Sequence, residues 1–277
     1  MRKLLSANFS RLWKEKTFWL AAAFMTIGSA FFSWMSYHTA MKNTGLDFYV
    51  EDMMFNMLPM MGFVFVFFIS MRLGTEFDEH TIRNKLIVGY NRTQVYFAEY
   101  VTCLIASLIL FAGMILFSTI SGWFFFRKLQ FDWLKLVFLL LCCILIAAVF
   151  SAMSVAICMN VHNKAVSLVV SLIFLFAILL LASFCISALA EEPTIYSYVS
   201  ITMDGVQFGD LIDNPAYIDG AQRTLYEFIA DLLPTGQTIQ LNNLNCERAF
   251  RWPLLSIIML LIATFAGYLP FCKQDIR

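Results

Sequence analysis

Residues 133–158 read WLKLVFLLLCCILIAAVFSAMSVAIC, a run in which Lys135 is the only charged side chain. A helix needs about 20 mostly apolar residues to cross about 30 Å of hydrocarbon, because it rises 1.5 Å per residue. The strands of a membrane β-barrel are about ten residues long and alternate in polarity instead. The run therefore predicts a transmembrane helix and argues against a barrel.

Five further apolar runs of this kind flank it on both sides. They span residues 17–37, 55–72, 98–126, 165–190 and 252–271. The whole chain is 60% hydrophobic and 14% charged, whereas about a quarter of the residues of a soluble domain are charged. We therefore predict an all-α membrane protein in which residues 1–277 form a single transmembrane domain of six helices.

The distribution of basic residues predicts the orientation of these helices, because Lys and Arg concentrate in cytoplasmic loops. With both termini cytoplasmic, twelve of the 19 basic residues lie inside. They are Arg2, Lys3, Arg11, Lys14, Lys16, Arg72, Arg83, Lys85, Arg92, Lys164, Lys273 and Arg277. The opposite side receives nine acids between Glu191 and Glu247. The formal net charge of zero gives no indication of nucleic-acid binding.

The first 16 residues have the pattern of an amphipathic helix. Leu5, Phe9, Leu12 and Trp13 share one helical face, and basic residues crowd the rest. Such a helix would lie in the inner membrane interface. The alternative is a basic tail that only sets the topology.

The sequence offers little for chemistry within the chain. The histidines are far apart and no metal-ligand spacing occurs, so we expect no metal site. Glu99 and Lys135 fall near predicted helix ends, where a side chain can reach a loop, and the spans otherwise carry almost no ionisable group. Cys246 lies in a loop and can pair with Cys185, although a free thiol is favoured. We therefore expect no catalytic residue.

Residues 74–97 form a polar segment between the second and third spans. Within GTEFDEHTIRNKLIVGYNRTQVYF, acids precede bases, and Gly89 can adopt the left-handed conformation that ends a helix. Ile82 and Leu86, with Phe77, would form one apolar stripe. Asn91 can cap the third span. The segment predicts a short cytoplasmic helix that docks on a soluble partner, and the alternative is an ordinary solvated loop.

This segment resembles the signature of type-2 ABC exporter permeases, in particular the bacitracin-resistance and lantibiotic-immunity type. Glu76, the stretch Thr81-Ile82-Arg83-Asn84-Lys85, Gly89 and Arg92 match the family pattern position by position. The resemblance implies that the segment couples the spans to an ATPase. The residues it assigns to coupling are Glu76, Asp78, Thr81, Arg83, Asn84, Lys85, Gly89 and Arg92.

The resemblance also implies partners and a location. The chain has no phosphate-binding loop of the Gly-x-x-x-x-Gly-Lys-Ser/Thr type, so no cofactor is expected in it. ATP and Mg would be bound by a separate ABC ATP-binding subunit, present in two copies. A second permease subunit would complete a homo- or heterodimer, surrounded by membrane lipids in the plasma membrane of a bacterium.

Residues 191–250 are too long for a simple turn and should fold on themselves. A Tyr- and Val-rich strand is expected at Thr194–Ile201, a turn at Asp213, and an amphipathic helix over Ala221–Leu233 that Pro234 ends. The resemblance implies an outer gate here, whose residues would be Leu225, Phe228, Ile229, Leu232, Leu233 and Pro234. The alternative is a folded extracytoplasmic lid without specific contacts.

The cargo path is expected along the second and fifth spans. Phe63 and Phe67 would line it, with Phe65 and Phe68 as further aromatic candidates, although plain helix packing is the alternative. An apolar path suits a hydrophobic or amphipathic cargo such as an antimicrobial peptide or a lipid-like compound. The alternatives are a membrane receptor or scaffold, and a subunit that extrudes sodium or another ion.

Overall fold

The protein is an all-α multi-pass membrane protein. A computed structural model describes residues 1–42, 49–197, 199–202 and 205–274. Six segments in it are long and apolar enough to cross a membrane, which confirms the predicted number. They are α2 (Lys16–Lys42), α3 with α4 (Val50–Phe55 and Leu58–Asp78), α6 (Arg92–Phe125), α7 (Trp133–Asn160), α8 (Lys164–Leu189), and the short 3-10 helix Ala249–Arg251 with α11 (Trp252–Lys273).

Two of the spans form the centre of the bundle. In the most apolar windows of the α3–α4 and α7 segments, 72% and 67% of the residues are buried, against 22% to 39% in the other four. α11 packs closely on α7, since a Cβ on Gly267 would lie only 2.5 Å from Ala156 Cα. Small residues allow such approach between membrane helices, where dispersion contacts drive association. The peripheral spans α2, α6, α8 and α11 keep apolar faces toward lipid.

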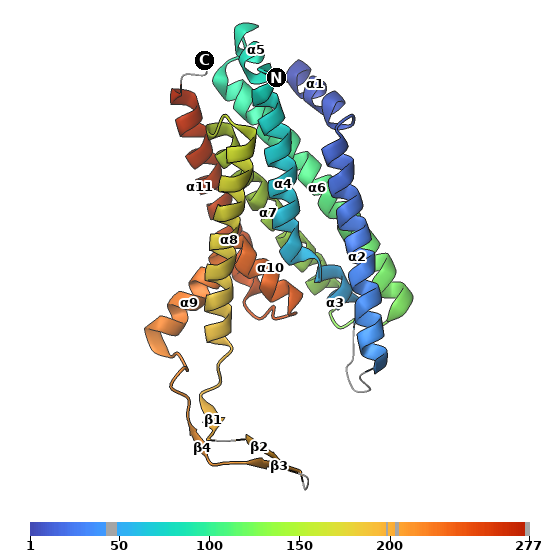
Figure 1. The fold of residues 1–277 in the computed structure, drawn as a ribbon, viewed down its shortest axis with the longest axis vertical. Coiled ribbons are helices and arrows are strands. Elements are labelled where there is room, and N and C mark those ends of the chain that lie inside the picture. Colours follow the sequence, from blue (N-terminus) through green and yellow to red (C-terminus); the bar gives the residue numbers. More distant parts are fainter. Residues whose placement is uncertain (43–48, 198, 203–204, 275–277) are drawn as a thin grey trace.

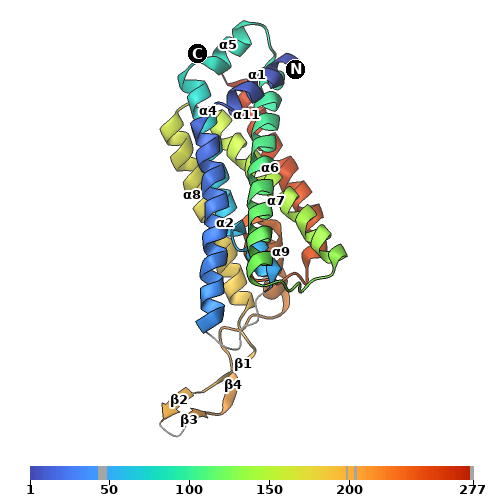
Figure 2. The same cartoon turned by 90° about the vertical axis from the view of Figure 1, so that its right-hand side faces the viewer.

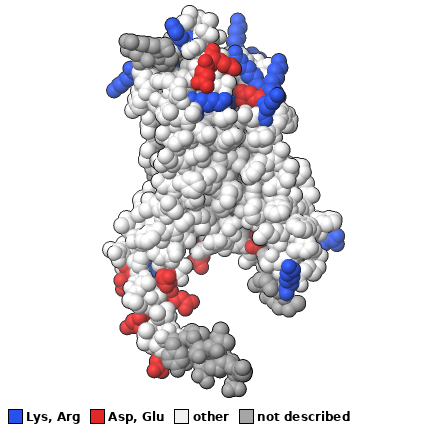
Figure 3. All heavy atoms as spheres, in the orientation of Figure 1, with Lys and Arg blue, Asp and Glu red and all other residues white. Residues whose placement is uncertain are grey.

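The two ends of the elongated bundle differ. Both termini lie at one end, together with α1 (Arg2–Leu12) and α5 (Thr81–Ile87) (Figure 1). Figure 3 shows Lys and Arg side chains gathered there, and mainly acids on the segment that projects from the opposite end. We call these the basic end and the loop end. This separation of charge is the one that the positive-inside pattern predicts, and the cytoplasmic placement of the basic end remains a prediction.

The loop end carries two helices and two strand pairs. α9 (Gly220–Leu232) and α10 (Pro234–Asn242) pack against the bundle, whereas the strands project away from it (Figures 1 and 2). β1 (Thr194–Tyr196) pairs antiparallel with β4 (Leu211–Asp213), and β2 (Val199–Thr202) pairs antiparallel with β3 (Gly205–Phe208). The region expected as one strand over Thr194–Ile201 thus holds two, β1 and β2, in different sheets. The turn after Asp213 is confirmed by Asn214, whose side chain accepts from Ala216 N at 2.9 Å.

The N-terminal helix forms, but its buried face differs from the predicted one. Leu4, Asn8 and Leu12 are buried, and Trp13 remains 49% exposed. Leu5 and Phe9 lie half-buried at the edge of this face. The reason is that α1 packs on α6, where the polar Asn8 finds hydrogen-bond partners. The helix is therefore a packed element of the bundle, and its place in the membrane interface stays a prediction.

Candidate functional site

The polar segment between the second and third spans is split by a sharp turn. α4 continues as a helix to Asp78, six residues beyond the predicted end of the span at residue 72. His80 then takes a left-handed conformation with φ 55°, and α5 starts at Thr81. The Thr81 hydroxyl donates to the Glu76 carbonyl at 2.8 Å and to Glu76 Oε2 at 2.6 Å. These bonds fix the start of α5 on the end of α4.

The inner face of α5 carries a lysine into the bundle. Ile82 is fully buried, and the Lys85 side chain is 11% exposed. Lys85 Nζ donates to Glu76 Oε2 at 2.7 Å, to Glu99 Oε1 at 2.6 Å and to Asn8 Oδ1 at 3.1 Å. One ammonium group thereby joins α5 to α4, α6 and α1.

An arginine completes this arrangement from the side of α4. The Arg72 side chain is fully buried, donates to Glu15 Oε1, and places Nη2 3.9 Å from Glu99 Oε2. Asn8 Nδ2 donates to Glu99 Oε1 at 2.7 Å, and Arg11 Nη1 donates to Glu76 Oε1 at 3.2 Å.

We call the resulting group the charge cluster. It consists of Asn8, Arg11, Glu15, Arg72, Glu76, Lys85 and Glu99. Three carboxylates face three cations in it, so buried charge is matched by opposite charge. Burial raises the pKa of the Glu15 carboxyl, against the opposing effect of Arg72. Removing one partner from such a group leaves another charge buried and unpaired, at a cost of roughly 3–5 kcal/mol.

The charge cluster corrects the prediction about Glu99. The sequence placed Glu99 at the edge of a span, where its side chain could turn to a loop. Because α6 starts at Arg92, Glu99 lies about two turns inside the helix and is fully buried. Asn8, Arg11 and Glu15 were missed as site residues. The sequence held one indication of the cluster: Asn8 is a polar residue four positions from both Leu4 and Leu12, so it shares their buried face of α1.

The outer face of the turn and α5 is exposed. Arg83 and Asn84 point outward, and two apolar side chains, Ile87 and Val88, are 71% and 77% exposed. Gly89 has φ 103° and ends the helix as predicted. We call this surface the docking face and define it as Asp78, Glu79, His80, Arg83, Asn84, Ile87 and Val88. Its use as a contact surface for a partner stays a prediction.

Arg92 lies outside the docking face and contacts the end of the last span, α11. Its Nη1 donates to the carbonyl oxygens of Phe271 at 3.4 Å and Cys272 at 3.2 Å, and also to that of Gln274. Basic side chains often satisfy the last carbonyls of a helix in this way. Nearby, Gln94 Oε1 accepts from Asn91 N at 3.3 Å, so the predicted cap of the third span is present.

The eight residues assigned to coupling therefore occupy four environments. Glu76, Thr81 and Lys85 belong to or support the charge cluster, while Asp78, Arg83 and Asn84 lie on the docking face. Gly89 shapes the turn, and Arg92 holds the end of α11. The part each residue has in coupling stays a prediction.

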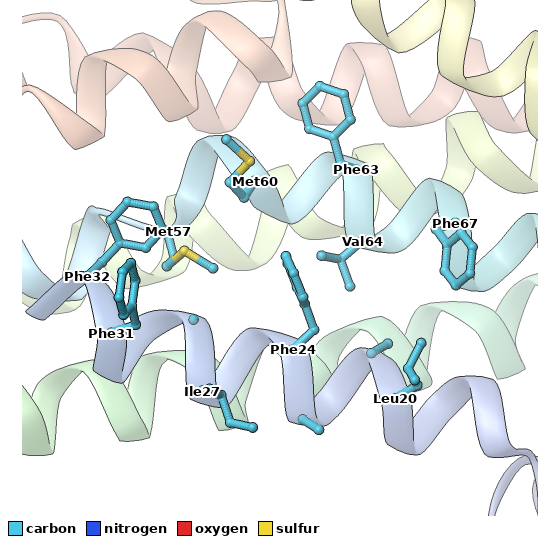
Figure 4. A pocket seen from close by; sticks show the side chains of 13 residues that line it. Leu20, Phe24, Ile27, Phe31, Phe32, Met57, Met60, Phe63, Val64 and Phe67 are labelled. Atoms are coloured by element: carbon cyan, nitrogen blue, oxygen red, sulfur yellow. The ribbon is translucent and has the colours of Figure 1, made fainter.

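Phe63 and Phe67 line an apolar groove between α2 and α4. Its volume is about 890 Å³, and Figure 4 shows both rings on α4, with Phe24 across from them on α2. Phe65 and Phe68 are fully buried and face the core instead. Phe63 also meets Phe176 of the fifth span, α8, at 5.1 Å between ring centroids. The groove therefore opens along the first and second spans, with the fifth at its edge.

The residues assigned to an outer gate do not share one environment. Leu225 and Phe228 are about half exposed, Ile229 and Leu232 are half-buried, and Leu233 is buried. α9 ends at Leu232, just before Pro234 as predicted, and Pro234 then starts α10, since its missing N–H is harmless in a first turn. The gate itself stays a prediction.

α10 is polar and yet packed inside the bundle. Thr235, Gln237, Thr238 and Gln240 are buried. Gln237 Nε2 donates to the Asp231 carbonyl at 2.6 Å, and Ser256 Oγ donates to Gln237 Oε1 at 3.0 Å.

Asp231 is the centre of this group. Its Oδ1 accepts from Gln240 Nε2 and from Trp252 Nε1, each at 3.2 Å, and Arg248 Nε lies 3.3 Å from Oδ2. We call Asp231, Gln237, Gln240, Arg248, Trp252 and Ser256 the loop-end cluster. Close by, Cys246 is a free thiol, as is Cys185, and burial raises the pKa of the Cys246 thiol to about 11.

No group of three or more His, Cys, Asp or Glu side chains within the described parts of the chain is arranged to hold a metal ion. A family model described as ABC-2 family transporter protein matches residues 4–198 of the 277-residue chain. The matched range contains the charge cluster, the docking face and the apolar groove, and ends before α9. A comparison with curated proteins gave no match.

Proposed function

The chain belongs to the ABC-2 family of transporter proteins, and from that membership we propose that it is the permease subunit of an ATP-driven exporter of a hydrophobic or amphipathic cargo. The proposed cargo is an antimicrobial peptide or a lipid-like compound. The ATP and Mg²⁺ are bound by a separate ABC ATP-binding subunit, and two copies of that subunit serve a dimer of permeases. The basic end faces this subunit in the cytoplasm of the cell.

The observation that carries the proposal is the pairing of an exposed face with a buried anchor on one short helix. The docking face offers Ile87 and Val88 to a partner. On the opposite side of α5, Lys85 is held by carboxylates of α4 and α6. A force applied to the docking face therefore reaches two spans at once. Coupling then means that the ATPase shifts a two-state equilibrium of the bundle.

The groove supports the choice of cargo class. All of its lining residues are apolar, and it opens along the side of the bundle between α2 and α4. We assign it to the cargo as a lateral entrance from the membrane. An ion would find no charged or polar side chain among these lining residues, although backbone carbonyls can coordinate ions in other proteins.

The test uses a matched pair of charge reversals on α5. The chain is co-purified with its ATP-binding subunit, and ATP turnover is measured with candidate peptides, lipids and sodium. Arg83→Glu is expected to leave the chain folded but to lower binding of the ATPase at least tenfold, because Arg83 is exposed. Lys85→Glu is expected to destabilise the chain itself, because it adds a fourth acid to the charge cluster.

Three outcomes would contradict the proposal. Failure to form any complex with an ABC ATP-binding subunit would refute the transport role. A stable complex whose ATP turnover responds to none of the cargoes would favour a receptor or scaffold. A response to sodium alone would favour an ion extruder.

A further inference from the structure

Two cavities lie on the same seam between α2 and α4. The apolar groove is lined by residues from Leu20 to Phe32 of α2. On the other side it is lined by Met57, which directly precedes α4, and by residues of α4 up to Phe67. A polar pocket of about 450 Å³ is lined by Lys16 and Thr17 on α2, and by Met71 to Glu79 around the end of α4. Thr17 and Leu20, like Phe67 and Met71, are three or four residues apart and share a helix face. The polar pocket therefore sits one helical turn beyond the apolar groove.

The polar pocket is lined by four cations, of which two lysines are available to a ligand. Lys14 and Lys16 are exposed, and neither forms an ion pair with any other residue that the structure describes. Arg72 is fully buried at the pocket wall, and its Nε and Nη2 donate no hydrogen bond to a described residue. The fourth cation, Arg11, is shared with Glu76 at 3.2 Å.

The acids that line the same pocket are mostly neutralised. Glu15 pairs with Arg72, and Glu76 pairs with Lys85 at 2.7 Å. Glu79 is exposed at the rim. Two free lysines thus face one free acid, while Arg72 stands paired with Glu15 at the pocket wall, which favours an anionic group. Basic pockets between membrane helices commonly bind lipid head groups.

The dimensions of the seam match one leaflet of a membrane. From Leu20 to Phe32 the groove follows twelve residue steps of α2, about 18 Å at 1.5 Å per residue. Half of a hydrocarbon core of about 30 Å is about 15 Å. The groove volume also falls within the range of about 300–1,000 Å³ that is usual for small-molecule sites. A cationic head site stands at one end of this apolar groove.

We propose that the seam between α2 and α4 binds one anionic glycerophospholipid, with its phosphate at Lys14 and Lys16, over the buried Arg72, and its acyl chains along the groove. The inference rests on the proposed function, because it names the ligand of the groove assigned to the cargo. Binding itself requires no ATP, so the two can fail separately: loss of lipid binding would leave the permease role in place.

The experiment measures lipid bound to the purified full-length chain by native mass spectrometry. The chain is released from nanodiscs of phosphatidylglycerol or of phosphatidylcholine with the same acyl chains. We expect one retained phosphatidylglycerol per chain and at least fivefold less phosphatidylcholine. The double change Lys14→Gln with Lys16→Gln is expected to lower phosphatidylglycerol retention at least fivefold, and Ala23→Trp, which fills the groove from an exposed position of α2, to lower it similarly.

Matched controls separate the site from general charge and bulk. Arg2→Gln with Lys3→Gln removes the same charge from exposed positions of the basic end, and Ala266→Trp adds the same bulk on an exposed position of α11. Both are expected to retain lipid like the wild type, and inorganic phosphate is expected not to displace it.

Four results would overturn the proposal. They are equal retention of the two lipids, equal loss in the controls, displacement by inorganic phosphate, and a change from dimer to monomer in Ala23→Trp with unchanged lipid. The last would make the groove a contact between two copies of the chain.

Discussion

The charge cluster at the basic end joins helices far apart in the sequence, whereas the members of the loop-end cluster come from one short stretch, residues 231–256. Asn8 and Glu99 are 91 residues apart, and Arg11 and Glu76 are 65 apart. Asp231 reaches Gln240 across 9 residues and Trp252 across 21. The first cluster therefore ties spans together, while the second fixes a local hairpin of helices on the bundle.

The two clusters also differ in how many of their side chains are charged. The charge cluster holds three carboxylates and three cations, so each member depends on the others for its neutralisation. The loop-end cluster contains one ion pair, Asp231 with Arg248, and is otherwise built from amides, a hydroxyl and an indole, while Arg248 also pairs with Glu227 outside the cluster at 2.9 Å. Loss of a neutral hydrogen bond costs less than an orphaned buried charge. The comparison predicts that stability depends more on the basic end.

Lys85→Met should have the largest effect on stability. It leaves Glu76 and Glu99 facing each other without their shared cation, and the expected loss is roughly 3–5 kcal/mol of the free energy of unfolding. Thermal unfolding in detergent, followed by circular dichroism, measures it. Arg83→Met on the exposed side of the same helix is the control and should change little. Adding Glu99→Gln to Lys85→Met should restore part of the loss; no restoration would argue against a coupled cluster.

Asp231→Asn should have an intermediate effect. It keeps the shape and an acceptor for Trp252 but removes one of the two carboxylates opposite Arg248, since Glu227 remains at 2.9 Å, so we expect a loss of about 1–3 kcal/mol. Glu247→Gln removes a charge from an exposed position of the same region and serves as the control. If Asp231→Asn destabilised the chain more than Lys85→Met, the proposed contrast between the two ends would be wrong.

Arg92→Ala should cost less, about 1 kcal/mol, because three carbonyls at the end of α11 lose a half-buried donor. Hydrogen exchange of the backbone around Phe271 to Gln274 should become faster, while exchange in α10 stays as it was. Arg92→Lys should restore only part of the protection, since lysine lacks the planar fork of arginine. If hydrogen exchange around Phe271 to Gln274 were unchanged in Arg92→Ala, Arg92 would not stabilise the end of α11.

The smallest effect on stability is expected for Ile87→Ser with Val88→Ser. Both side chains are more than 70% exposed, so the free energy of unfolding should stay within about 0.5 kcal/mol. Binding of the ATP-binding subunit should nevertheless weaken at least tenfold, as measured by co-purification at graded subunit concentrations. Ile195→Ser with Leu211→Ser, on exposed strands of the loop end, is the matched control. If both variants bound the ATP-binding subunit equally well, the docking face would be excluded as its binding surface.

The sequence predicted what depends on local pattern. The six spans follow from the length of apolar runs, and Gly89 and Asn91 mark the end of α5 and the start of α6 because of their own backbone and side-chain chemistry. α9 also appears where its apolar spacing predicted it. The predicted helix of residues 1–16 forms as α1, but spacing could not tell that Asn8 belongs to its buried face.

Other features depended on partners distant in the sequence. Glu99 and Arg72 look like span-end charges until α1 and α5 are placed beside them. α10 contains so many polar residues that its burial could not be expected from hydropathy, and it becomes understandable once Asp231 and Ser256 are seen to satisfy its amides. Pairing across a bundle leaves no periodic trace in a single sequence.

The sequence by itself determined that this chain is a six-span helical membrane protein with a short polar helix between its second and third spans, because hydrophobic length and turn chemistry are local properties. Only the tertiary structure decided which face of that helix is free, which charges are buried together, and that a cationic pocket continues an apolar groove between α2 and α4. These are matters of distance between side chains from different helices, and the packing of the bundle sets those distances.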